Sequence, residues 1–513
     1  MNPFSGRSKC AARAAMSSAT IAILLLAAGC GFGGGNGGGG GGGGGNTGFS
    51  NSNLNGHYAF SQKGVAVVQG GGATDFFSEA GVFTADGNGN LTNIIDEFTQ
   101  SGQFFTTFGA PLAGSYHVNN DGTGLLTFNF GGGFTSNFRI TFTDTAHFYL
   151  IEQDLAATGA GSGEKQDTTA FSAMPSGTFT FAGHDLFSAS ARVGSLDFNA
   201  GVITGVEDIL FSGGSVTSPS FTGNITQPAD TNGRGKISLS DGSFFIFYVV
   251  SSNKFRLLSF SGSLELGVAE KQTGGPFSTT SLAAGNSYVF GSFGETSVAD
   301  GIHSAGVFTT DGNGLVTGGA TDFVQDGAVF ANVAVQNTSD YSLASNGRGV
   351  LNLNLGNGGT NQKIFWMVSG TRAYFLVNSS ATLEDGTFSQ QQGAPFTNAG
   401  LNAQSAMFMD GFDLAFKDRV GTMTPNGSGT FNWSQQANSF DAGLGLGTLS
   451  SFSTTGTYQV NANGRATATV NNLLGNNVDS SMVFYLVSNN TGYMVEEDQG
   501  FDIGGAFTVQ TGP

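Results

Sequence analysis

The sequence is poor in cysteine and in positive charge. Cysteine occurs only at Cys10 and Cys30, so disulfides cannot staple the rest of the chain, and its stability must come from a packed core. Lys and Arg total 18 against 36 Asp and Glu, which gives a formal net charge of −18. A chain this acidic repels phosphate backbones, and we therefore expect no nucleic-acid partner.

Tryptophan and tyrosine are also scarce, whereas phenylalanine is abundant. The chain has 2 Trp and 10 Tyr against 48 Phe. Sugar-binding modules usually stack Tyr or Trp on sugar rings, so this balance argues against carbohydrate recognition. Phe has no polar group and belongs mostly inside a fold, which indicates an aromatic core. Helical periodicity is missing beyond the N-terminal segment.

The N-terminus has the order of a secretory signal. Arg7, Lys9 and Arg13 precede an apolar run at 19–29, and no acidic residue accompanies them. The run is too short to cross a bilayer comfortably, which takes roughly 20 apolar residues. Cys30 follows directly after it.

This segment resembles the lipobox of bacterial lipoproteins, in which the Cys thiol is acylated and the chain is cut before it. One departure is Ala27, where that family more often has Leu. The resemblance implies a signal peptide at 1–29, lipid on Cys30 and a membrane as partner. Gly31 follows the Cys in place of an Asp retention signal, so we expect an outer-membrane location facing the periplasm or the exterior.

Residues 31–48 are almost entirely glycine. Such a run buries nothing and loses the most backbone entropy on ordering, so it predicts a flexible tether within 30–53. Without the three basic residues of the signal, the mature chain has 15 basic against 36 acidic residues, a net charge of −21. That charge argues against lying flat on anionic lipid.

Four repeats of about 110 residues follow the tether. We place them at 54–171, 172–277, 278–396 and 397–513. The first and third match best, since the segment 80–89 recurs at 305–314 with only one change. The second and fourth share Arg-Val-Gly, so the order is A-B-A-B. A period this long indicates tandem domains.

Each repeat has the pattern of short antiparallel strands. Residues 351–355 alternate strictly between Leu and Asn, which indicates one buried and one wet face. Asp-Gly and Asn-Gly pairs, as at Asp86-Gly87 and Asn346-Gly347, are hairpin signals. The sequence therefore predicts an all-β chain of four units, with small up-and-down barrels preferred to sandwiches.

The candidate sites have ordinary structural interpretations. Asp86-Gly87-Asn88-Gly89 lacks the alternating acids of a calcium loop and is interpreted as a turn. The five histidines have no metal-ligand spacing and are interpreted as surface residues. They are His57, His117, His147, His184 and His303.

Two further patterns recur between repeats. Acids at Glu97 and Asp322, and in the runs at 152–154 and 496–498, suit either a glycoside-hydrolysis pair or solvated strand ends, and we prefer the strand ends. A glutamine closes every repeat, which favours a structural role. These glutamines are Gln166, Gln272, Gln391 and Gln510.

Together these features predict a cell-envelope lipoprotein that displays β domains for a structural, adhesive or binding role. We expect no catalysis, no cofactor and no metal, with Cys30 as the one modified residue. An envelope or extracellular partner is expected beside the membrane. Two alternatives stay open: a binder holding a small apolar ligand in each barrel lumen, and an extracellular hydrolase.

Overall fold

The computed structural model describes residues 48–68, 74–185, 190–229, 231–260, 263–296, 301–412, 415–473 and 478–512. Cys30, the signal peptide and the glycine run lie outside these residues. The described chain is all-β, with short 3-10 turns and no α-helix. None of its helical segments is long and apolar enough to cross a membrane.

Unit one is an eight-stranded antiparallel barrel with one added edge strand. Its sheet closes because β2 pairs with both β1 and β3, and β4 lies at the edge beside β3. Its elements are η1 (Asn51–Asn53), β1 (Asn55–Val67), β2 (Thr74–Asp86), β3 (Asn90–Gln100), β4 (Gln103–Thr106), β5 (Leu112–Val118), β6 (Thr123–Gly131), β7 (Phe134–Phe142), β8 (His147–Glu152) and β9 (Ala157–Lys165).

Unit two is a closed barrel of eight strands in sequential order. Its elements are η2 (Thr168–Ala170), β10 (Gly177–Asp185), β11 (Ser190–Asn199), β12 (Val202–Phe211), β13 (Ser220–Ile225), β14 (Arg234–Leu239), β15 (Phe244–Ser251), β16 (Lys254–Ser259) and β17 (Glu265–Lys271).

Unit three is a half-barrel. Its nine-stranded sheet ends at β21 and β22, and single bridges such as Val335 to Leu355 join the two ends. Its elements are η3 (Thr279–Ser281), β18 (Ser287–Thr296), β19 (Gly301–Thr310), β20 (Val316–Gln325), β21 (Ala328–Val335), β22 (Asp340–Leu343), β23 (Arg348–Asn354), β24 (Thr360–Ser369), β25 (Arg372–Val377) and β26 (Thr382–Gln390).

Unit four is again a closed barrel of eight strands. Its elements are η4 (Asn398–Gly400), β27 (Ser405–Phe412), β28 (Phe416–Pro425), β29 (Thr430–Asp441), β30 (Leu446–Val460), β31 (Arg465–Val470), β32 (Ser480–Ser488), β33 (Thr491–Glu496) and β34 (Asp502–Val509). The predicted all-β fold of four barrel units is therefore confirmed, with the third unit only half closed.

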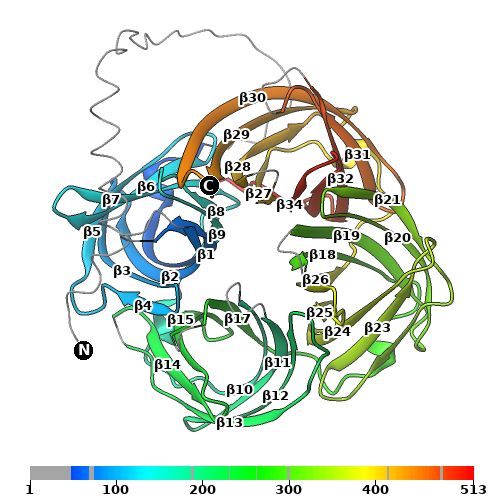
Figure 1. Ribbon diagram of the computed structural model, residues 1–513, viewed down its shortest axis with the longest axis horizontal. Coiled ribbons are helices and arrows are strands. Elements are labelled where there is room, and N and C mark those ends of the chain that lie inside the picture. Colours follow the sequence, from blue (N-terminus) through cyan, green and yellow to red (C-terminus); the bar gives the residue numbers. More distant parts are fainter. Residues whose placement is uncertain are drawn as a thin grey trace.

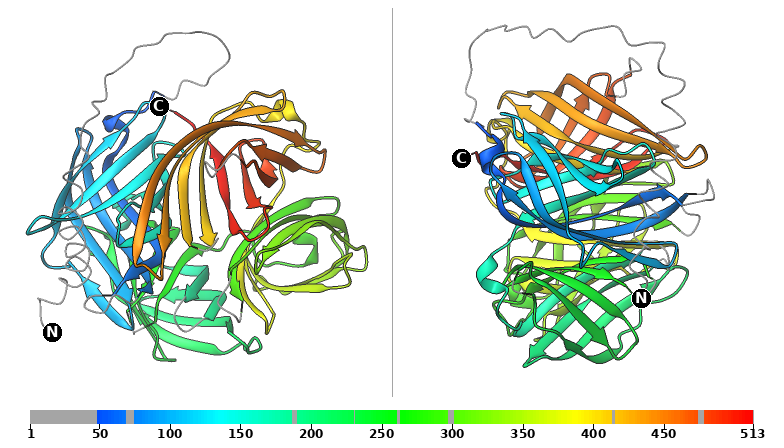
Figure 2. Two further views of the ribbon diagram at one scale, coloured as in Figure 1. Left: turned by 45° about the horizontal axis from the view of Figure 1, so that its top comes forward. Right: turned by 90° about the vertical axis from the view of Figure 1, so that its left-hand side faces the viewer.

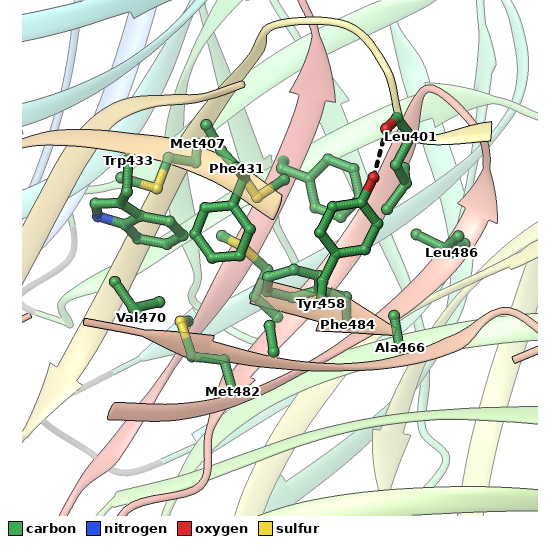
Figure 3. Packing of buried hydrophobic residues seen from close by; sticks show 14 of the residues in the cluster. Leu401, Met407, Phe431, Trp433, Tyr458, Ala466, Val470, Met482, Phe484 and Leu486 are labelled. Carbon is green, nitrogen blue, oxygen red and sulfur yellow. Dashed lines mark hydrogen bonds between the residues drawn. The ribbon is translucent and has the colours of Figure 1, made fainter. Parts of the chain in front are cut away.

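Each unit has its own aromatic and aliphatic core. Alternation places every second side chain of a strand inside, so that β23 buries Leu351 and Leu353 between half-exposed Asn residues. Figure 3 shows the core of unit four, where Phe431, Trp433 and Tyr458 pack among methionines. The hydroxyl of Tyr458 donates to the carbonyl of Leu401 at 2.8 Å and so fixes the segment that enters the barrel.

The four units form a closed ring. Figure 1 shows them following one another around a centre, with the C-terminus beside β8 of unit one. The views of Figure 2 keep units one and four side by side. Apolar clusters join neighbours at each seam, for example Val193 with Trp366 between units two and three.

Three of the four seams have the same kind of ion pair, in which the carboxylate is fully buried. A carboxylate on the third strand of one unit accepts from an arginine and an aromatic N–H or O–H of the next unit. Removing such charges from water is costly, and the double pairing offsets that cost. The three clamps are Glu97 with Arg234 and Tyr248, Asp208 with Arg348 and Trp366, and Asp322 with Arg465 and Tyr485.

The seam between units four and one has neutral residues at the equivalent positions. Gln436 stands where strand pairing puts the carboxylate, and Thr123 pairs with Thr141 where the arginine pairs with the aromatic residue. Asn438 instead donates to three carbonyls of unit one, including that of Ala157 at 2.8 Å. This seam joins units that are not consecutive in the chain.

The closing glutamines fasten each unit to the next, which confirms a structural role. Each side-chain amide donates to two carbonyls across a seam, one of them in the following unit's Asn-Gly or Asp-Gly turn. The turn glycine leaves room for it, since a Cβ on Gly347 would lie 2.6 Å from Nε2 of Gln272. The acceptors are Asn232 and Val249 for Gln166, Asn346 and Met367 for Gln272, Asn463 and Leu486 for Gln391, and Asp121 and Phe142 for Gln510.

Candidate functional site

The first strands of the four units bring four equivalent residues to the centre of the ring. In each unit one residue of the first strand pairs with a glycine of the second strand, as Phe60 pairs with Gly81. Three residues further along, the four units carry four different side chains, all of which line one central cavity. We call them the central layer: Lys63, His184, Phe293 and Asp410.

The central layer is held together by contacts across the ring. Nζ of Lys63 lies 3.0 Å from the centroid of the Phe293 ring, close enough for a cation–π interaction. The imidazole of His184 lies 5.3 Å from the same ring. Phe293 therefore contacts cationic side chains from units one and two.

His184 is the most tightly bound member of the layer. Its Nδ1 lies 2.5 Å from a carboxylate oxygen of Asp385, and its Nε2 lies 3.7 Å from Glu295. Burial opposes protonation, but the attraction of Asp385 outweighs it and raises the pKa of His184 to about 9. A protonated His184 thus joins unit two to unit three at neutral pH.

Two cavities flank the central layer. The first, here called the polar chamber, has a volume of about 430 Å³ and reaches strands of all four units. The second, here called the aromatic chamber, has a volume of about 120 Å³ and lies against units one, three and four. Both are lined by Lys63, Phe293 and Asp410, so the layer stands between them.

Ion pairs across two seams form the wall of the polar chamber. Arg256 donates to Glu164 at 2.7 Å, and Arg372 donates to Glu270 at 2.6 Å. Burial alone would raise the pKa of Glu164, but Arg256 and Lys254 lower it to about 2. These carboxylates are therefore ionised and engaged by the wall itself.

The aromatic chamber has a different lining. Phe76, Phe412 and Phe416 lie around it together with Phe293. Burial raises the pKa of Asp418 well above its ordinary value and lowers that of His303 to about 4, so His303 is neutral at pH 7. Glu295, Asp410 and Asp502 also face this chamber.

A third cavity lies at the mouth of the half-barrel. It has a volume of about 480 Å³ and is lined by polar residues of unit three, among them Ser304 and Glu384. Lys363 lies nearby between the Phe290 and Phe375 rings, 4.5 and 4.4 Å from their centroids. Burial lowers its pKa to about 8.

The histidines divide into two groups, and the surface interpretation is wrong for one of them. His117 and His147 are exposed and His57 is half-buried, but His184 and His303 are buried at the ring centre. The side chains that surround His184 and His303 belong to other units, so their burial could not be predicted from spacing along the chain.

The solvated interpretation of the recurring acids is also wrong. Glu97 and Asp322 are fully buried and belong to seam clamps, and Glu152 and Glu496 are fully buried inside their barrels. Glu496 pairs with Arg419 at 2.6 Å, and Glu152 accepts from Gln62 at 3.1 Å. Strand ends at a seam or inside a barrel are shielded from solvent. The pattern of a single sequence does not distinguish them from exposed strand ends.

The Asp-Gly-Asn-Gly segments connect strands as the sequence predicted. Asp86 accepts from the backbone N–H groups of Asn88 and Asn90 at 2.7 and 3.0 Å, so its own turn occupies it. Asp311 does the same with Asn313 and Leu315. Across the described residues, no cluster of three or more His, Cys, Asp or Glu side chains could hold a metal ion.

Sequence reasoning missed the central layer. Repeats were recognised by residues that recur, whereas this position carries Lys, His, Phe and Asp in turn. The only available signal was its constant place, three residues after the aromatic or methionine residue of each first strand. The chain matches no protein-family model, and no curated protein resembles it in sequence.

Proposed function

We propose that this chain is a cell-envelope lipoprotein whose ring of four β-barrels serves a binding or structural role without catalysis. Lipid on Cys30 would hold it to the outer membrane, and the glycine run would carry the ring away from the surface. Several acyl chains anchor a protein stably where one does so weakly. The observation that carries the proposal is the ring, which fixes four unlike side chains around one central cavity.

The placement of the acidic residues supports a role without catalysis. Glycoside hydrolysis needs two carboxylates that flank a substrate in an accessible site. Glu97 and Asp322 are instead sequestered in seam clamps, and Glu164 and Glu270 are paired with arginines. The recurring acids therefore hold the ring together.

The packing of the barrels favours the ring over the single barrels as the binding element. Aromatic rings meet inside the barrels, as Phe128 and Phe138 do at 5.0 Å between centroids. Interiors filled in this way leave little room for a ligand of the lipocalin kind. The half-barrel does have a cavity of about 480 Å³ at its mouth, but residues of unit three alone line it. The cavity shared by all four units is the better candidate site.

Fractionation of the host cells tests the anchor. The wild-type chain should remain in the membrane fraction after an alkaline wash and should incorporate labelled fatty acid. Cys30→Ser should move to the soluble fraction without label, and Cys10→Ser, the matched control within the signal, should behave like wild type. Membrane retention of Cys30→Ser would refute the lipid anchor. Native mass spectrometry of the host-purified protein would then test the binding role.

A further inference from the structure

The aromatic chamber combines ring faces with an excess of negative charge. Four phenylalanines from units one, three and four line a space of about 120 Å³. Three carboxylates, those of Glu295, Asp410 and Asp502, share this lining with a single ammonium group, that of Lys63. Of the two other titratable side chains in the lining, His303 is uncharged at neutral pH, and burial raises the pKa of Asp418 well above its ordinary value.

The carboxylates have fixed positions. Asp502 accepts from the backbone N–H of Gly327 at 3.0 Å, which holds it at the junction of units three and four. Glu295 faces His184 at 3.7 Å, which is longer than a hydrogen bond. Its Oε1 atom therefore has no hydrogen-bond donor among the described residues. Asp410 belongs to the central layer and faces both chambers.

We propose that the aromatic chamber binds a small organic cation of the methylated-ammonium class. Such an ion presents an apolar surface with a delocalised positive charge, which suits phenylalanine faces and nearby carboxylates together. A neutral apolar molecule would bring an apolar surface against these carboxylates without adding a charge of opposite sign. An anion would meet three like charges.

Lys63 acts as a resident competitor in this site. Its ammonium group lies over Phe293 at 3.0 Å, where an incoming cation would find one of its ring faces. Removing that charge should therefore strengthen binding of an organic cation. The same change would abolish binding of a carboxylate ligand, so Lys63 separates the two ligand classes.

This inference names the ligand class for the binding role proposed above and rests on that role, but it is independent of the lipid anchor. Loss of membrane attachment in Cys30→Ser leaves the chamber unchanged. Failure to bind a cation, in turn, leaves the fractionation result unchanged.

Three probes of one shape test the charge preference. Choline, its neutral carbon analogue 3,3-dimethylbutan-1-ol and the anion 3,3-dimethylbutanoate should be titrated calorimetrically into the full chain in a non-ionic detergent. We expect choline to bind at least about tenfold more tightly than the alcohol, and the carboxylate not to bind. Equal binding of choline and the alcohol, preference for the carboxylate, or no binding of choline would overturn the proposal.

Two cavity variants place the binding in the chamber. Asp410→Asn should weaken choline binding about tenfold or more, whereas Lys63→Met should strengthen it. A misfolded variant cannot gain affinity, so the second result does not depend on tolerance of the first change. Asp197→Asn, on the exposed face of β11, is the matched surface control and should leave binding unchanged. Unchanged affinity in both cavity variants would place the ligand elsewhere and refute the assignment.

Discussion

At the scale of single residues, the ring centre stabilises charges that an isolated barrel would leave in water. His184 faces Asp385 on β26 and Glu295 on β18, both from unit three, with Lys63 of unit one as the opposing cation. The imidazole is almost fully buried, which opposes its protonation, and these carboxylates keep the proton in place. The charge state of one histidine is thereby linked to contact between two units.

This linkage predicts a pH dependence of stability. A pKa raised from 6.5 to about 9 stabilises the fold fully below about pH 6.5, by about 3 kcal/mol at most, and the gain is lost as the pH rises to about 9. Wild type should therefore exceed His184→Gln in unfolding free energy at pH 6 by more than at pH 9.5. Denaturant titrations at both values measure the difference. His117→Gln on the exposed face of β5 is the control, and a gap independent of pH would contradict the charged state of His184.

At the scale of elements, the seams join strands whose interacting residues lie far apart in the sequence. Arg465 on β31 reaches Asp322 on β20, 143 residues earlier, and Tyr485 on β32 donates to the same carboxylate. Both charged groups are buried between units three and four. Losing one partner of such a pair destabilises the fold strongly, because the other partner is left buried, charged and unpaired.

Arg465→Met should therefore lower the unfolding free energy by about 3 to 5 kcal/mol. Adding Asp322→Asn should recover part of the loss, because Asn keeps an acceptor for Tyr485 without a charge. Gln436→Met, at the equivalent place in the neutral seam, should change stability by no more than about 1 kcal/mol. Equal losses in the Arg465 and Gln436 variants, measured by chemical denaturation, would show that the clamp contributes nothing special.

These elements also show how far the sequence could predict the structure. Strands and turns follow from local alternation and Asp-Gly or Asn-Gly pairs, and they were predicted correctly along with the division into four barrel units. The half-barrel was not, since the gap between β21 and β22 depends on pairing rather than on pattern. The clamps and the central layer were missed because the residues that Glu97 and Asp410 face belong to other units, which the sequence of one repeat does not reveal.

At the scale of the whole molecule, the ring closes at the one seam that has neither a covalent linker nor an arginine clamp. Three seams join consecutive units, so the covalent linker and an arginine clamp both hold them. The fourth joins the last unit to the first, without a linker and with Gln436 and Thr123 in place of the clamp. Besides Asn438 and apolar contacts, its closure uses hydrogen bonds near the C-terminus, where Gln510 and Thr511 reach carbonyls of unit one.

Gln510→Ala should consequently open the ring, whereas Gln272→Ala should not. Each change removes two hydrogen bonds of similar length to carbonyls of the neighbouring unit, at 2.7 and 3.0 Å for Gln510 and at 2.9 and 3.1 Å for Gln272. Each loss costs about 1 to 3 kcal/mol, but only the fourth seam lacks a linker that keeps its units together. Hydrogen exchange should therefore quicken in β7, β8 and β34 of Gln510→Ala, and small-angle scattering should show a larger radius of gyration. In Gln272→Ala the exchange should stay slow on both sides of the seam, since Arg348 and Asp208 remain paired. Equal exchange rates in the two variants would mean that linker and clamp do not matter, and that the four seams are alike.

Ring closure should also be a condition for ligand binding at the centre. The two chambers have walls from units on both sides of the closing seam, so an opened ring should lose the central cavity.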